Sequence, residues 1–525
     1  MSNNIVIKYL KSCYCIEDVS DIDAEDHLLD TYRKQPLTIE RCRVLLKLLH
    51  EQTHLIQDIS CFSSYVEDRI QQVLLSYLTY LPHQADITFP LFSRNNRTNE
   101  VPERKKGVEV RMVDIQLYYS YYYHDFKEVL FRKGKFPTIE ADLFRTSKGV
   151  IKEFSISYRD LLESHAHFKS IFDLYVLTSE SPYKGTVHQL IAKDNLFPFS
   201  NTGKGRVGIN ILPFKYQKTY YYPFYLFMQA TSFNWGDIMN YLNTYFPIQG
   251  IKGHDEYLKS YFLFTLIFEA AVCIPSFDDI LYKSKTKNFK FDYFNPVTRF
   301  AQILNFFAKF SHDELMEYKT GDLKSLIDTL SKEYGWPDFE TTIRSHSLGD
   351  DTLVNMVTCD SLEMIQRIGR DFIKMKSDCN ANFTWVSLAL NELNVPTISR
   401  TSKGLRQFCK GNWPKDVTDR YQSFYDAWYG NDLDGTHREY RQFLKLISEK
   451  LFRTTILDTD LYFGGEYNCP MKASECPHRC EFCNSIKHIQ DIKEFTSNKG
   501  IKCMFSDYLN SKEFITPISR TLSDF

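Results

Sequence analysis

Apolar residues recur at every third or fourth position along much of the chain, which predicts a largely helical protein. The clearest run covers residues 38–80, where Thr38 follows Pro36 and is placed to cap the start of a helix. A second run covers residues 158–177. Further helices are expected around residues 222–247, 255–273, 296–332, 360–376 and 417–452.

Two segments depart from this helical pattern, and a third is helical but unusually apolar. Residues 83–112 are polar and charged, which predicts an exposed insertion. Residues 200–213 contain three glycines but lack the GK[ST] ending of a phosphate-binding loop, so a loop with a short strand is expected. Residues 261–275 are strongly apolar but too short, and with Glu269 too charged, to span a membrane. They predict a buried core helix, and the chain as a whole predicts a predominantly helical α+β fold.

Composition narrows the classes of protein that fit. The chain has 525 residues, enough for several domains, and its 64 Lys and Arg nearly balance its 66 Asp and Glu. This balance leaves no excess of positive charge that would attract nucleic acid. Thirteen cysteines, an odd number, occur without an N-terminal secretory signal. These features predict a cytoplasmic protein whose thiols stay reduced or bind metal.

A five-residue motif carries the most specific chemistry. Residues 50–54 read HEQTH, and side chains four apart share one face of a helix, so His50 and His54 can bind one Zn²⁺. Glu51 lies beside them and is placed to act as a general base on a metal-activated water. The flanking residues are apolar, and burying this polar group without a metal or partner would be costly.

A catalytic zinc needs a third protein ligand, and no further histidine follows closely after His54. The best candidate is Glu163, in the segment ESHAH on an apolar helix, where Ala166 would allow close helix approach. His165 and His167 are alternative ligands or donors to the oxyanion formed on attack. Glu269 is the next candidate, because it is a carboxylate in an otherwise apolar helix.

At these residues the sequence resembles the gluzincin branch of zinc metallopeptidases, in which an HExxH helix and a Glu on a later helix complete the site. The string HEQTHLIQD is also similar to uncharacterised bacterial proteins that carry HExxHxxQD followed by an E-S-x-A segment. The resemblance implies a zincin-like helical core, with His50, His54 and Glu163 as zinc ligands and Glu51 as general base.

A second candidate metal site lies near the end of the chain, where four cysteines fall within fifteen residues. A closed zinc site with four thiolate ligands would stabilise a small folded module, and this module could bind a protein partner. An iron–sulfur cluster and ordinary free thiols are the alternatives, and a radical-SAM pattern fits poorly because so little chain follows. The four residues are Cys469, Cys476, Cys480 and Cys483.

Together these patterns predict a zinc peptidase that acts on a peptide or protein. Residues 1–345 would form the metallopeptidase-like domain, residues 346–460 a helical region and residues 461–525 the Cys-rich zinc module. Two other classes stay open. One is a regulatory or interaction protein with a non-catalytic zinc. The other is a helical di-iron oxidase that uses Glu51 and His54 as half of its site.

Overall fold

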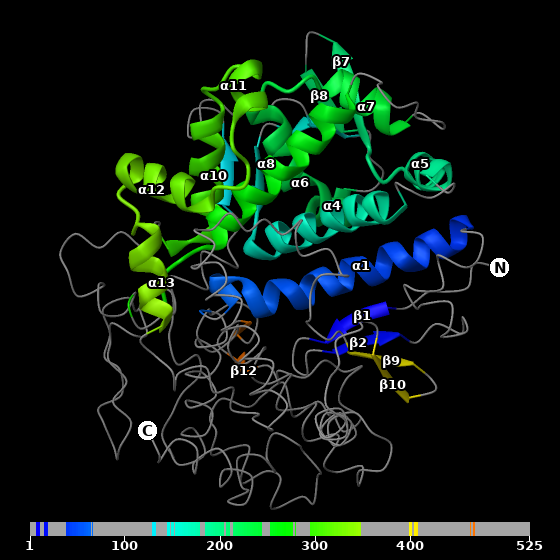
Figure 1. Ribbon diagram of the computed structural model, residues 1–525, viewed down its shortest axis with the longest axis horizontal. Coiled ribbons are helices and arrows are strands. Elements are labelled where there is room, and N and C mark those ends of the chain that lie inside the picture. Colours follow the sequence, from blue (N-terminus) through cyan, green and yellow to red (C-terminus); the bar gives the residue numbers. More distant parts are fainter. Residues whose placement is uncertain are drawn as a thin grey trace, which may run out of the picture.

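In a computed structural model of the protein, the described part of the chain is mostly helical (Figure 1). Predicted helices at 360–376 and 417–452, the polar insertion at 83–112 and the four C-terminal cysteines lie outside the described residues. The structure describes residues 7–10, 15–18, 38–64, 66, 129–132, 144–146, 149–151, 153–178, 184–203, 206–209, 214–243, 253–276, 279, 294–347, 398–401, 404–407, 462–463 and 466–467.

Two long helices form where the apolar periodicity predicts them. Helix α1 spans Ile39–Ser60, and its N-cap is Thr38, whose Oγ1 accepts a hydrogen bond from Arg41 N at 3.2 Å. This confirms the predicted cap, although the helix is shorter than the periodic run. Helix α4 spans Tyr158–Thr178 and also confirms its prediction. The two helices pack along each other, and this contact brings the motif on α1 to the acidic segment on α4.

The other helices build most of the core together with α1 and α4. The apolar segment predicted as a core helix is α8, most of whose side chains are buried. The stretch 296–332 divides into three helices, because Ser311 forms a capping box with Glu314 and Asp322 caps the next helix. These helices are α5 (Lys184–Lys193), α6 (Phe214–Ala230), α7 (Trp235–Asn243), α8 (His254–Val272), α10 (Pro296–Phe307), α11 (His312–Glu317), α12 (Leu323–Tyr334) and α13 (Phe339–Ser347).

The described strands are short and form small sheets. The hairpin of β7 and β8 lies where a loop with a short strand was expected. The largest sheet has four strands in the order β1-β2-β9-β10, in which β2 and β9 are parallel. The strands are β1 (Ile7–Leu10), β2 (Cys15–Asp18), β3 (Val129–Arg132), β4 (Phe144–Thr146), β5 (Gly149–Ile151), β6 (Glu153–Ile156), β7 (Phe199–Gly203), β8 (Arg206–Ile209), β9 (Ile398–Thr401), β10 (Gly404–Gln407), β11 (Tyr462–Phe463) and β12 (Glu466–Tyr467).

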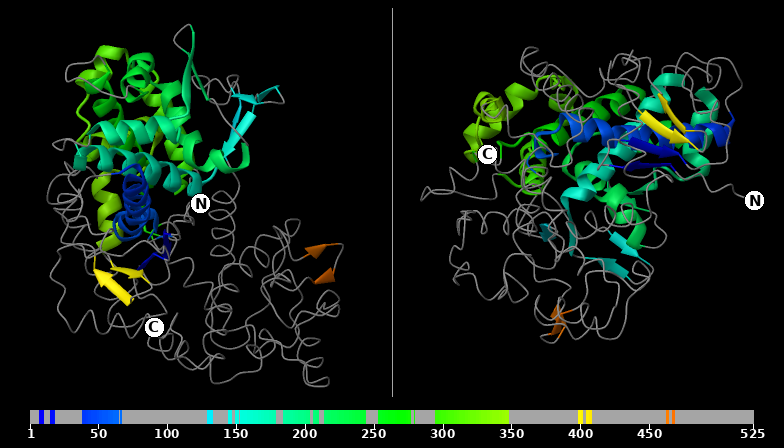
Figure 2. Two further views of the ribbon diagram at one scale, coloured as in Figure 1. Left: turned by 90° about the vertical axis from the view of Figure 1, so that its right-hand side faces the viewer. Right: turned by 90° about the horizontal axis from the view of Figure 1, so that it is seen from below.

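Helix α1 lies between two layers. The four-stranded sheet covers one side of it, and α4 with the helices behind it covers the other, as both views show (Figures 1 and 2). The pairing of β2 with β9 crosses the boundary predicted near residue 345, and the division into three domains stays a prediction. Within the described ranges, no helix combines the length and apolar character that a bilayer crossing requires.

Candidate metal centre

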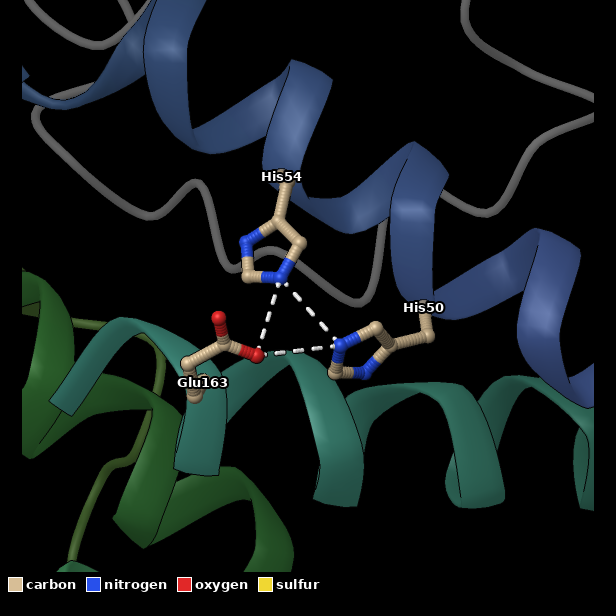
Figure 3. A group of neighbouring side chains, drawn as sticks. All are labelled: His50, His54 and Glu163. Carbon is tan, nitrogen blue, oxygen red and sulfur yellow. Dashed lines mark hydrogen bonds and ion pairs between the residues drawn. The ribbon is translucent and has the colours of Figure 1, made fainter. Parts of the chain in front are cut away.

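Two helices bring three metal-binding side chains together. His50 and His54 project from consecutive turns of α1 toward α4, which contributes Glu163 (Figure 3). Glu163 Oε2 lies 3.2 Å from His50 Nε2 and 3.3 Å from His54 Nε2, and the two Nε2 atoms are 3.2 Å apart. Each side chain keeps about 15 % of its surface exposed, so solvent reaches the cluster.

The spacing of these three atoms fits a tetrahedral metal ion. With bonds of about 2.0–2.1 Å, neighbouring ligands of a tetrahedral zinc lie about 3.3–3.4 Å apart. Neighbouring ligands of an octahedral ion with bonds of that length would lie about 2.8–3.0 Å apart. The observed separations of 3.2–3.3 Å let the three atoms share one ion, and without an ion they are hydrogen-bond distances. Two imidazoles and a carboxylate are also a common donor set for zinc, and three protein ligands leave a fourth position open.

In the absence of a metal, the charged forms of Glu163 and His54 stabilise each other. Burial raises the pKa of Glu163, but hydrogen bonds from His50 and His54 and their charges outweigh it, so the pKa lies well below its ordinary value. Burial lowers the pKa of His54, but the hydrogen bond and charge of Glu163 outweigh it, with further help from Glu51 and Gln57, and leave that pKa raised. A divalent cation would replace this histidine proton as the partner of the Glu163 carboxylate.

Three further side chains lie around the cluster. The charge of Glu51 contributes to the raised pKa values of both His54 and Tyr220. The ring of Tyr220, on α6, is 5.8 Å from the ring of His50. Arg159 is largely exposed, and its Nε lies 3.7 Å from Glu163 Oε1, the second oxygen of the carboxylate.

Sequence reasoning did not single out Tyr220 or Arg159. The aromatic run at residues 219–227 is typical of an aromatic core or a hydrophobic groove, and nothing in it shows which tyrosine lies beside the cluster. Burial, followed by the charges of Glu163 and Glu51, raises the pKa of Tyr220. Its phenol therefore stays protonated at neutral pH and keeps an O–H to donate.

The other candidate ligands lie outside this group of three. His165 is fully buried, its Nδ1 is 3.0 Å from Gln57 Nε2, and its ring stacks on Phe268. His167 Nε2 donates to the carbonyl of Leu196 at 3.2 Å.

Burial, followed by the charge of His50, lowers the pKa of His167 to about 4. The imidazole is therefore neutral at neutral pH. Glu269 is buried on α8, where its charge helps to raise the pKa of Tyr261.

Within the described residues, His50, His54 and Glu163 are the group of three or more His, Cys, Asp or Glu side chains close enough to share a metal ion. Comparisons with models of known protein families, with curated proteins and with solved structures found no match for this chain.

Proposed function

We propose that the chain is a zinc-dependent peptidase that hydrolyses a peptide bond in a peptide or protein substrate, in a reducing, cytoplasmic setting. The observation that carries the proposal is the convergence of three metal-binding atoms, which lie 3.2–3.3 Å from one another: His50 Nε2, His54 Nε2 and Glu163 Oε2. The HEQTH motif supports it further, because it places Glu51 directly beside these ligands. The relationship to gluzincin-type peptidases rests on these motif residues.

Each residue of the site has a role in this reaction. His50, His54 and Glu163 hold the zinc, which when bound polarises a water molecule and the substrate carbonyl. Glu51 accepts a proton from the attacking water as its oxygen bonds to the carbonyl carbon. Glu51 then returns the proton to the amide nitrogen, and the C–N bond breaks to release the amine and the carboxylate products.

Tyr220 is proposed as the donor to the oxyanion that forms on attack. Its ring lies beside His50, and its raised pKa keeps the hydroxyl protonated. The hydroxyl would form its strongest hydrogen bond only when negative charge develops on the substrate oxygen. Such a donor lowers the activation barrier of hydrolysis more than it strengthens substrate binding.

The direct test compares Glu51→Gln with Glu40→Gln, a matched change at an exposed glutamate of the same helix. Glu51→Gln should lower kcat/KM on a mixture of fluorogenic peptides by about 10²–10⁴-fold, because the proton acceptor is lost. Glu40→Gln should match the wild type. Zinc content should stay unchanged in both variants, since neither residue is a ligand.

Other outcomes identify the alternatives. Bound zinc without hydrolysis by the wild type, on a broad peptide library, would contradict the peptidase and favour an interaction protein. Two irons per chain in metal analysis would favour the di-iron oxidase. A Cys480→Ser/Cys483→Ser variant should lose one zinc and keep the other if the C-terminal cysteines form the second predicted site.

A further inference from the structure

Gln57 joins the metal-binding helix to its neighbour. It lies on α1 one turn after His54, and only 1 % of the residue surface is exposed. His54 Nδ1 lies 2.9 Å from Gln57 Oε1. Gln57 Nε2 lies 3.0 Å from the backbone carbonyl oxygen of Leu162 and 3.0 Å from His165 Nδ1, both on α4. A single buried amide therefore contacts a candidate ligand and the residue that precedes Glu163.

The hydrogen-bond partners fix the direction of this amide. A carbonyl oxygen can only accept a hydrogen bond, so the Gln57 atom that faces Leu162 must be the NH₂ group. The amide oxygen then faces His54, and His54 Nδ1–H donates to it. When a metal ion displaces the Nε2 proton that faces Glu163, the proton held on Nδ1 leaves the lone pair of Nε2 to bind that ion.

We propose that Gln57 is the positioning residue of His54. Because the backbone of α4 holds the Gln57 amide and this amide holds the His54 imidazole, the position of α4 sets the orientation of the zinc ligand on α1. This inference rests on the proposed zinc site and goes beyond it, because it states what selects the metal-binding nitrogen of His54. The carbonyl of Leu162 orients the amide, and the amide orients the imidazole. Glu163 follows Leu162 directly. One turn of α4 therefore supplies a metal ligand and also the carbonyl that fixes the orientation of a second ligand, His54.

The test titrates zinc-free full-length protein with Zn²⁺, in competition with a chelator, for Gln57→Met and for Gln52→Met. Gln52 is a second buried glutamine of α1, so the two changes remove the same group from the same helix. Gln57→Met should weaken zinc binding about 10–100-fold, the cost of losing an outer partner of a metal-bound histidine. Gln52→Met should stay within about threefold of the wild type, because it keeps the Gln57 amide that His54 contacts.

A third variant separates positioning from packing. Gln57→Glu keeps an oxygen that accepts from His54 Nδ1–H, so it should recover most of the affinity lost in Gln57→Met, while its thermal stability falls because the donor to Leu162 is lost. The spectrum of Co²⁺-loaded protein provides a second measurement. Gln57→Met should shift the d–d bands of the His₂Glu site, and any thiolate site is recognised by its own charge-transfer band.

The possible results separate the two proposals. Equal zinc affinity in Gln57→Met and Gln52→Met would overturn the role of Gln57 and leave the zinc site standing. Equal losses in Gln57→Glu and Gln57→Met would show that the oxygen acceptor is not what matters. If the wild-type site binds no zinc, the proposed function fails and the role of Gln57 fails with it. Zinc binding without peptidase activity would leave this affinity comparison fully valid.

Discussion

Replacing Glu163 with glutamine should remove most of the stabilisation that zinc gives the folded chain. Its Oε2 lies within 3.3 Å of both histidine nitrogens and closes the ligand triangle, and glutamine keeps the size of the side chain but loses the charge. At a free zinc concentration a thousand times Kd, a bound ion stabilises the wild type by about 4 kcal/mol.

A hundredfold loss of affinity reduces this to about 1.4 kcal/mol at the same zinc concentration. The hundredfold figure is the upper end of the cost of losing an outer partner, so it is a modest assumption for a ligand. The difference of about 2.7 kcal/mol corresponds to roughly 3–4 °C in Tm if residues 1–345 unfold as one unit, at about 2.1 cal/mol/K of unfolding entropy per residue.

The assay is a thermal melt of chelator-treated protein with and without added zinc, followed by circular dichroism. Glu317→Gln, at an exposed glutamate of α11, is the matched control and should keep the full zinc-dependent rise in Tm. Any zinc site at the C-terminal cysteines contributes equally to both variants and cancels in the comparison. An equal rise in Tm for Glu163→Gln and Glu317→Gln would refute the assignment of Glu163 as a ligand.

Three other changes have defined outcomes. Tyr220→Phe should lower kcat by about 10²-fold with KM and zinc content unchanged, because only a transition-state donor is lost; unchanged kcat in peptide assays would contradict its role. Burial lowers the pKa of His346 to about 4, so on acidification the unfolded chain binds this proton before the folded chain does. The free energy of unfolding should therefore fall by up to about 3 kcal/mol between pH 6.5 and pH 4. His346→Gln should reduce the slope of that part of the pH–stability curve in urea unfolding, where His167 contributes as well, and an unaltered slope would argue against this source. Gly253 has φ +103° and a Cβ there would lie 2.3 Å from Asp237 O, so Gly253→Ala should destabilise by about 2 kcal/mol or more in denaturant titration, whereas a neutral effect would contradict that geometry.

The parts of the fold that the sequence predicted depend on local physics. The Thr38 cap and the one-turn spacing of His50 and His54 follow from helix geometry, which the order of residues determines directly. The division of residues 296–332 could also have been predicted, because Ser311 and Glu314 have the spacing of a capping box. The choice of Glu163 rested on the local cluster ESHAH, and the structure places its carboxylate against both histidines of the motif.

The remaining features depend on contacts between distant segments. The position of Tyr220 beside His50 arises from the way α6 packs on α4, and nothing in an aromatic run distinguishes one tyrosine from the next. His165 carries the same side chain as a ligand would, yet it contacts Gln57 and stacks on Phe268. Which residues lie across from a helix face is decided by tertiary packing, so spacing within α4 could not separate these roles.

The parallel pairing of β2 with β9 also sets an order of events during protein synthesis. Ile16 pairs with Ser399, and at about 5–20 residues per second a ribosome needs roughly 20–80 s to make the chain between them. Through that interval the β1–β2 hairpin beneath α1 lacks its other two strands, and an isolated hairpin is only marginally stable. His50, His54 and Glu163 emerge early in the same interval. Zinc captured by them would hold α1 against α4 until the sheet closes, so the ion could guide the nascent chain before it takes part in any reaction.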